Sequence, residues 1–85
     1  MPELSRFLGI IIAMYYREHN PAHFHAIYGE FEITIELASG KIDGEFPKRA
    51  LAHVLEWKNI HLAELQEAWA LARVSRPLPR IDPLE

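Results

Sequence analysis

Cysteine is absent from this 85-residue chain, so no disulfide can hold it together. A domain of this size without disulfides must be stabilised by side-chain packing alone, which is typical of proteins in a reducing cytoplasm. A long hydrophobic run is also absent, because the apolar stretch at residues 7–16 has half of the roughly 20 residues that a membrane-spanning helix needs. The N-terminus has no cationic start and no small-residue cleavage site of a signal peptide. We therefore expect a cytoplasmic protein that does not bind membranes.

An excess of positive charge is missing as well. Nine Lys and Arg residues against twelve Asp and Glu residues leave a formal net charge of −3 and an isoelectric point near 5.9. Nucleic-acid binding without sequence preference depends on Lys and Arg displacing counterions, so an RNA partner would require a local basic patch. Apolar residues make up 49% of the chain and charged residues 25%, which are globular values and argue against disorder. The length predicts one domain over residues 1–85.

The residues that are present divide the chain into a strand-rich half, residues 7–43, and a helical half, residues 47–73. The first half is rich in Ile, Phe and Tyr and predicts strands at about 8–16, 23–28, 31–37 and 41–43. The third of these has the clearest alternation, since every second residue is apolar. Strands followed by a helical segment predict an α+β fold: a small antiparallel sheet of three to four strands followed by one long bent helix or two helices packed on it.

The helical half is too long for one straight helix. Residues 47–73 would form a helix of about 40 Å, whereas a domain of this size is about 30 Å across. We therefore expect a bend or break near residues 58–61; packing of the overhang on a second subunit would be the alternative. The last segment, residues 75–85, contains three prolines and predicts an extended tail whose aliphatic side chains dock on the domain.

Three of the five histidines, His19, His23 and His25, lie within seven residues. Imidazole, with an unperturbed pKa of roughly 6.5, both takes and gives a proton near neutral pH, and its neutral form binds metals. On a strand, His23 and His25 would share one face while the residues between and beside them point into the core. An Asn-Pro turn signal brings His19 to the start of that strand. We therefore expect the chemistry of the protein at the run of His19, His23 and His25. The other two histidines, His53 and His61, are expected on the solvent-facing side of the helical half.

The histidine run is part of a longer pattern. Residues 14–29 read Met-Tyr-Tyr-x-x-His-Asn-Pro-x-His-Phe-His-Ala-x-Tyr-Gly, with Ser-x-Phe-x-Gly-Ile at residues 5–10 and Pro-Lys-Arg-Ala-Leu at residues 47–51. On these motifs the chain resembles a family of small bacterial proteins of unknown function. The resemblance implies a gene that lies beside that of a second small uncharacterised family, the two being commonly labelled a suspected toxin–antitoxin pair. It therefore implies a small protein partner encoded nearby.

Our leading hypothesis is a toxin of the ribonuclease type. Such an enzyme activates a ribose 2′-OH and requires a general base, a general acid and a cation for the phosphate. His23 and His25 would supply the acid–base pair. The chain offers further hydroxyl and cationic side chains for the remaining roles: Tyr16, Tyr28, Arg17, Lys48 and Arg49. This reaction requires no metal or other cofactor.

A metal site is the second hypothesis. A His-x-His pair on a strand with a third imidazole nearby can hold zinc or iron, so the ligands would be His19, His23 and His25. This hypothesis predicts that the imidazole nitrogens converge within about 3–4 Å of one point. The carboxylates that would complete the site are Glu32, Glu36 or Asp43.

The third hypothesis is a non-enzymatic protein-binding module in which the histidines shape a turn or an interface. Trp57 and Trp69 would lie some 120° apart around one helix, so we expect one in the core and the other at a contact surface. Lys48 and Arg49 at a helix N-terminus would suit an anion such as phosphate. The unpaired edges of so small a sheet predict a homodimer unless a partner covers them.

Overall fold

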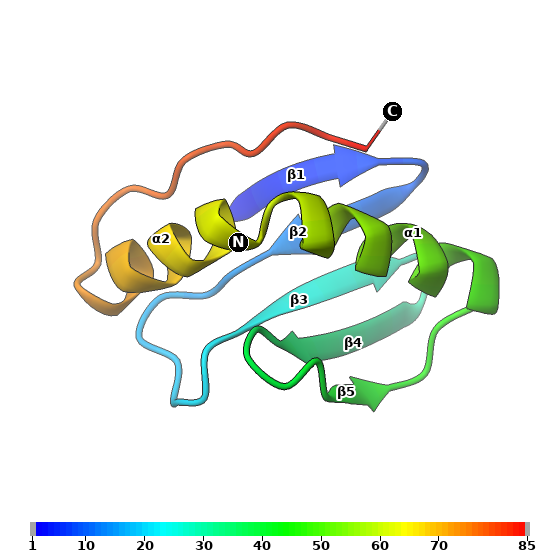
Figure 1. Ribbon diagram of the computed structural model, residues 1–85, viewed down its shortest axis with the longest axis horizontal. Helices are drawn as coiled ribbons and strands as arrows, with labels where there is room; N and C mark the ends of the chain where they lie inside the picture. Colours follow the sequence, from blue (N-terminus) through cyan, green and yellow to red (C-terminus); the bar gives the residue numbers. More distant parts are fainter. Residues whose placement is uncertain (1, 85) are drawn as a thin grey trace.

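The fold is a five-stranded antiparallel sheet followed by two helices (Figure 1), in a computed structural model that describes residues 2–84. The strands are β1 (Glu3–Phe7), β2 (Ile10–Ala13), β3 (His23–Tyr28), β4 (Phe31–Glu36) and β5 (Ile42–Gly44). The helices are α1 (Lys48–Ile60) and α2 (Leu62–Arg73). The strands lie side by side in chain order, so each pairs with the next one along the sequence. The predicted α+β class is confirmed.

The prediction of a single first strand over residues 8–16 is wrong. Leu8 and Gly9 form a turn with positive φ angles of 50° and 79°, and this turn joins β1 to β2 as a hairpin. The continuous apolar run concealed the turn, because Leu8 lacks the turn preference of Gly, Asn or Asp. The sheet therefore has five strands rather than three or four. Because β2 lies between β1 and β3, this part of the segment is in the interior of the sheet.

The paired strands β3 and β4 separate an apolar face of the sheet from a polar one. Their register places His25 opposite Thr34 and Ile27 opposite Glu32. Successive residues of a strand point to opposite faces. The helix-facing set is buried and consists of Phe24, Ala26, Ile33 and Ile35. The opposite set is mainly polar and includes His23, His25, Glu32, Thr34 and Glu36. The predicted alternation is therefore confirmed.

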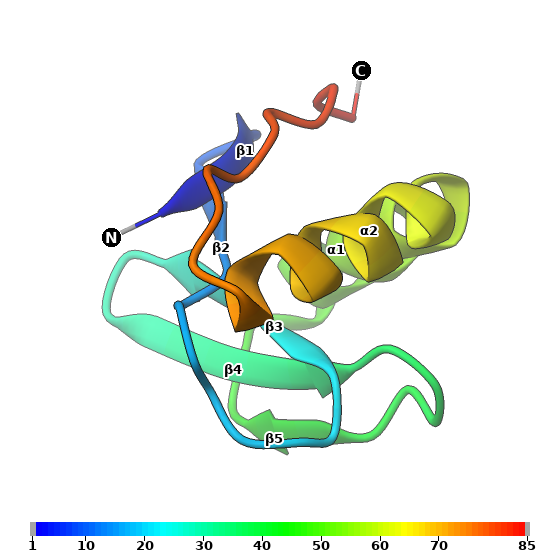
Figure 2. The ribbon, with the colours of Figure 1, turned by 90° about the vertical axis from the view of Figure 1, so that its left-hand side faces the viewer.

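The helical segment breaks at His61, between the end of α1 and the start of α2, which confirms the break expected near residues 58–61. Both helices lie on the same side of the sheet, as Figure 2 shows. Trp57 of α1 is fully buried, with its ring centroid 5.6 Å from that of Phe7 and 6.0 Å from that of Phe24. The longest dimension of the molecule is 33 Å, less than one straight helix of about 40 Å would need. Within residues 2–84, no helix is long and apolar enough to cross a membrane.

The C-terminal tail runs in extended form beside β1 (Figure 1). Ile81 is buried, and its backbone N–H donates to the carbonyl oxygen of Leu4 over 2.8 Å. The indole Nε1–H of Trp57 donates to the carbonyl oxygen of Asp82, also over 2.8 Å. These contacts confirm that the proline-rich tail docks on the domain, and they cover part of the outer edge of β1.

Candidate functional site

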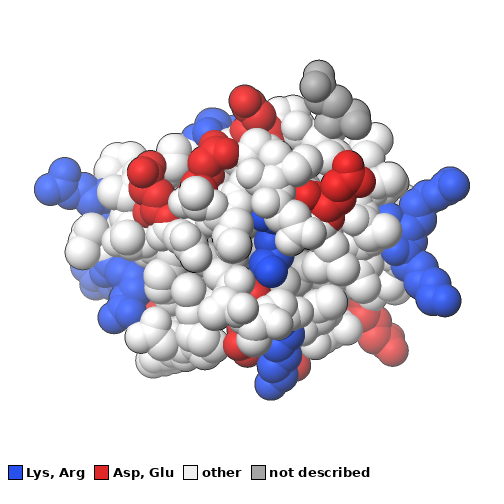
Figure 3. All heavy atoms as spheres, in the orientation of Figure 1, with Lys and Arg blue, Asp and Glu red and all other residues white. Residues whose placement is uncertain are grey.

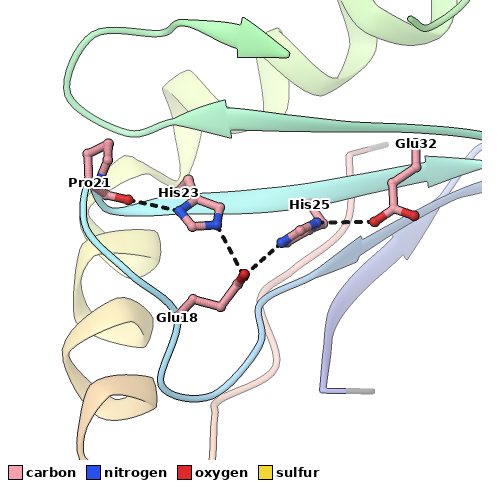
Figure 4. Close-up of polar contacts among 5 residues, drawn as sticks. All are labelled: Glu18, Pro21, His23, His25 and Glu32. Atoms are coloured by element: carbon pink, nitrogen blue, oxygen red, sulfur yellow. Dashed lines mark hydrogen bonds and ion pairs between the residues drawn. The ribbon is translucent and has the colours of Figure 1, made fainter. Parts of the chain in front are cut away.

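Two histidines of β3 and one glutamate of the preceding loop meet on the polar face of the sheet. The loop, residues 14–22, leaves β2 and turns back so that Glu18 points at both rings (Figure 4). One carboxylate oxygen, Glu18 Oε1, lies 3.1 Å from His23 Nε2 and 2.8 Å from His25 Nε2. These three side chains form the Glu18–His23–His25 cluster.

The other nitrogen of each ring also faces an oxygen atom. His23 Nδ1 lies 2.8 Å from the carbonyl oxygen of Pro21, and His25 Nδ1 lies 3.1 Å from Glu32 Oε2 (Figure 4). All four ring nitrogens therefore face hydrogen-bond acceptors, whereas a neutral imidazole carries only one N–H donor. The cluster consequently needs additional positive charge at its centre, either as extra protons or as a bound cation.

Aromatic rings and partial burial shield the cluster. The ring of His25 packs edge-on against Tyr15 at a centroid distance of 4.4 Å, and that of His23 lies 5.2 Å from Trp69 of α2. The side chains of His23 and His25 are 15% and 12% exposed. Burial alone would raise the pKa of Glu18, but the hydrogen bond and charge of His25, together with those of His23, outweigh burial and lower it. The carboxylate form of Glu18 is therefore favoured.

The loop that carries the glutamate is tied to the C-terminal end of α2. The backbone N–H of Arg17 donates to the carbonyl oxygen of Ala72 over 3.4 Å, and its Nε donates to Ser75 Oγ over 3.0 Å. On the other side of the glutamate, Asn20 Oδ1 accepts a hydrogen bond of 3.0 Å from Arg73 Nη1. Arg17 has a φ of 58°, in the left-handed region that non-glycine residues rarely occupy, and these contacts hold it there. Packing against α2 therefore sets the position of the glutamate.

A hollow lies beside the cluster and gives it access to solvent. It is lined by Glu18, His19, Asn20, Pro21, His23, Thr34, Glu36 and Asp43. This described lining contains three carboxylates and neither Lys nor Arg. On the face of the molecule seen in Figure 3, Lys and Arg side chains are scattered among acidic and uncharged ones rather than gathered in one patch. A phosphate in this hollow would therefore meet neither Lys nor Arg in the lining.

Of the residues predicted from the sequence, the structure brings His23 and His25 together but not the third histidine. His19 is exposed and lines the hollow, yet it lies outside the group of atoms that could share a metal ion. Glu18 belongs to that group instead, so the atoms that lie close enough to share one ion come from Glu18, His23 and His25 rather than from the predicted His19, His23 and His25. The physical reason is that the loop turns the side chain of residue 18, rather than that of its neighbour, toward β3. The predicted cation Arg17 is engaged with Ser75.

The remaining predicted residues lie around the cluster or away from it. Glu32 contacts Nδ1 of His25, the nitrogen that points away from Glu18. Glu36 and Asp43 line the hollow but do not belong to the group of atoms that could share a metal ion. Tyr28 lies at the far end of β3, where its ring is 6.0 Å from that of Phe46. Lys48 and Arg49 are exposed at the start of α1. Tyr16 is exposed in the loop of residues 14–22. The structure therefore does not bring Tyr28 or the α1 cations to the histidines.

Both tryptophans are buried, which corrects the expectation that one of them forms a contact surface. Trp57 is 0% and Trp69 8% exposed. The expectation assumed one continuous helix, whereas the helical segment breaks at His61 and both indoles belong to the hydrophobic core. His61, expected to face solvent, is only 12% exposed: its ring lies 5.3 Å from that of Trp57, and its Nδ1 lies 2.5 Å from Glu64 Oε1.

Sequence reasoning missed Glu18 and Tyr15. The signal for Glu18 was a carboxylate directly before the histidine run, but residues in a loop have no periodicity that shows which side chain turns inward. Tyr15 lies inside the apolar run for which the sequence predicts a strand. Burial, then the charges of Glu32 and Glu18, raise the pKa of Tyr15, so the phenol that packs on His25 stays protonated.

The comparison with protein families matches residues 9–70 to a domain of unknown function, DUF4160. Because the match covers more than half of the chain, the chain belongs to this family. No curated protein and no solved structure matches it.

Proposed function

We propose that this DUF4160 protein is the chemically active member of a two-gene, toxin–antitoxin-like module and that it acts on phosphodiesters through the Glu18–His23–His25 cluster. The observation that carries the proposal is the convergence of both Nε2 atoms on one carboxylate oxygen beside a hollow. Imidazole and carboxylate groups that lie this close together beside a hollow can act on a phosphodiester either by exchanging protons or by holding a cation. Their partial burial makes the charges among them more effective than they would be in water.

The two histidines are placed for different roles. His23 lines the hollow, so it is the ring that would meet a substrate there. His25 lies between Glu18 and Glu32, which suits a ring that keeps the carboxylate of Glu18 in position. A ribonuclease-type reaction also requires a cation for the phosphate. The described lining of the hollow supplies none from Lys or Arg, so this requirement must be met by something bound at the cluster.

Induced expression of the full chain in a bacterial host tests the proposal. We expect the wild type to arrest growth and to degrade cellular RNA, whereas Glu18→Gln and His25→Asn should do neither. The matched control is His61→Asn, because His61 has the same side-chain exposure as His25 and also contacts a glutamate. The control should still arrest growth. Circular dichroism and immunoblotting establish that each variant folds and accumulates.

Growth arrest that persists in both folded cluster variants would contradict a role of the cluster in toxicity. Absence of arrest by the wild type, in a host without the neighbouring gene, would contradict the toxin role itself. Growth arrest without RNA degradation would be consistent with a toxin but would exclude RNA as its substrate. Each outcome therefore removes a different part of the proposal.

A second candidate function, binding of a small partner protein, is favoured by exposed apolar side chains at the opposite end of β3. Leu8, Tyr28 and Phe31 are 57%, 37% and 38% exposed. Leu8 and Tyr28 line one hollow and Phe31 lines another, and the two hollows share Pro47. Exposed apolar groups that adjoin one another are typical of protein contact surfaces.

Co-purification of the chain with the protein encoded beside it tests this second function. The double variant Leu8→Ser/Phe31→Ser should lose the partner. The control is Ile60→Ser/Val74→Ser, because these apolar residues are still more exposed, at 61% and 66%, and lie on other parts of the molecule. Equal loss of the partner in both variants would contradict a specific role for the first surface.

A further inference from the structure

We infer that the Glu18–His23–His25 cluster is a binding site for one divalent first-row metal ion, with Glu18 Oε1, His23 Nε2 and His25 Nε2 as the three protein ligands. The three side chains offer one ligating atom each, and these atoms lie within 4.8 Å of one another. Two imidazoles and one carboxylate are a ligand set that zinc and non-haem iron use in proteins. Two nitrogen ligands also argue against Mg²⁺ and Ca²⁺, which prefer oxygen.

The distances within the cluster are close to those between the ligands of a metal ion. Around a tetrahedral zinc ion with bonds of about 2.1 Å, neighbouring ligand atoms are ~3.4 Å apart. Glu18 Oε1 lies 3.1 Å from one Nε2 and 2.8 Å from the other. Small side-chain adjustments would therefore open the cluster to the required size, with no movement of β3.

The outer contacts of the cluster match those of metal-binding histidines. A histidine that binds a metal through Nε2 nearly always donates its Nδ1–H to a carbonyl or carboxylate oxygen, which fixes the tautomer and the ring orientation. Here the Nδ1 of His23 faces the carbonyl oxygen of Pro21, and the Nδ1 of His25 faces Glu32 (Figure 4). Both rings therefore present Nε2 to the same point, and with a metal ion bound there each ring would carry its single proton on Nδ1.

A bound metal ion resolves the hydrogen-bond conflict in the cluster better than extra protons do. Without a cation, all four nitrogens are satisfied only if both rings are charged, because protonation of Glu18 would supply one O–H for two Nε2 atoms. Two imidazolium rings with centroids 5.3 Å apart would repel each other in a partly buried site. One divalent ion leaves both rings neutral and satisfies both Nε2 atoms and the carboxylate.

Three protein ligands leave a coordination position open, which is the arrangement of catalytic rather than structural zinc sites. The hollow lined by Glu18 and His23 provides the approach to that position. The ion would also add the positive charge for a phosphate that the lining of the hollow lacks. This role of the ion depends on the proposed function, whereas its binding does not.

Metal titration of the purified full chain, without an affinity tag and stripped of metal by a chelator, tests the inference. We expect isothermal titration calorimetry with Zn²⁺ at pH 7 to show one saturable site per chain. Glu18→Gln and His25→Asn should each weaken binding by more than the roughly 10–100-fold that loss of an outer partner of a ligand costs. His19→Asn and His61→Asn are the controls and should bind as the wild type does. The first control also separates this ligand set from one that contains His19.

Nitrogen-15 NMR of the wild-type histidine side chains keeps the test independent of whether a variant folds. Addition of Zn²⁺ should shift the Nε2 signals of His23 and His25 and leave those of His19, His53 and His61 unchanged. No saturable binding, or shifts confined to the other three histidines, would overturn the inference. Binding in a protein that does not arrest growth would remove the proposed function and leave the metal site, and arrest without binding would do the reverse.

Discussion

Two His–Glu contacts in this molecule have similar local geometry and different surroundings. The rings of His25 and His61 are both 12% exposed, and each has a nitrogen close to a glutamate oxygen, at 2.8 Å from Glu18 and 2.5 Å from Glu64. Glu64 follows His61 by three residues, at the start of α2, so one helical turn brings them together. Glu18 reaches His25 from a loop that must first fold back over β3.

The difference lies in how many acceptors each ring faces. A neutral His61 can donate Nδ1–H to Glu64 and so satisfy that carboxylate, which makes the pair a local stabiliser of the helix start. His25 lies between two carboxylates, and one of them is shared with His23. The comparison teaches that a His–Glu contact alone indicates little, whereas rings with more acceptors than protons indicate a place for a cation.

The largest difference between the two sites should appear in the effect of Zn²⁺ on stability. At a free Zn²⁺ concentration 100 times the Kd, binding to the folded chain alone raises the free energy of unfolding by about 2.7 kcal/mol. We expect this increase in the wild type and in His61→Asn, and its loss in His25→Asn. Urea unfolding followed by circular dichroism, with and without Zn²⁺, measures it. An equal increase in all three proteins would place the ion elsewhere.

The next largest effect, on the affinity for Zn²⁺, should come from Glu32, whose carboxylate contacts Nδ1 of His25. Glu32→Gln removes the charged acceptor of the Nδ1–H and should weaken Zn²⁺ binding roughly 10–100-fold, because outer partners orient a ligating ring and raise its basicity. Calorimetric titration gives the affinity. Glu64→Gln makes the same chemical change beside His61 and should leave the affinity unaltered; a matching loss there would contradict the distinction between the two sites.

A smaller effect on stability is expected from Arg17, which ties the loop of residues 14–22 to the end of α2. Arg17→Ala removes the hydrogen bond from Nε to Ser75 Oγ that ties the loop to the end of α2. The loss of one such bond should lower the free energy of unfolding by about 1 kcal/mol. Arg49→Ala, at the exposed start of α1, serves as the control and should change it little. Urea unfolding measures both, and equal effects would show that the loop does not depend on this contact.

The smallest effect on stability is expected from the His61–Glu64 contact at the start of α2. Glu64 lies in the first turn of α2, where a negative charge interacts favourably with the helix dipole. Glu64→Gln should therefore cost only about 0.3–1 kcal/mol of unfolding free energy, and the cost should decrease in high salt because Glu64 is half exposed. Thermal unfolding at two salt concentrations tests this. A cost independent of salt would mean that packing, rather than charge, makes the contact.

Local patterns predicted much of the fold. The period-2 alternation over β4 and the His-x-His spacing on β3 correctly separated the wet face of the sheet from the dry one. The length of the helical half predicted its break near His61. The first hairpin escaped prediction, because its turn pairs Gly9 with Leu8, an apolar residue without turn preference, inside a continuous apolar run. Sequence pattern therefore succeeded where a period is imposed by one buried face and failed where both faces are apolar.

The sequence by itself determined that His23 and His25 share one face of a strand, because the side-chain period of a strand is two and depends on nothing else. It also determined the α+β order, since a strand-rich half precedes a helix-rich half. Only the tertiary structure decided which third group joins the two rings. The position of Glu18 follows from the hold of α2 on the loop through Arg17 and Asn20, and such long-range contacts leave no periodic trace in the sequence.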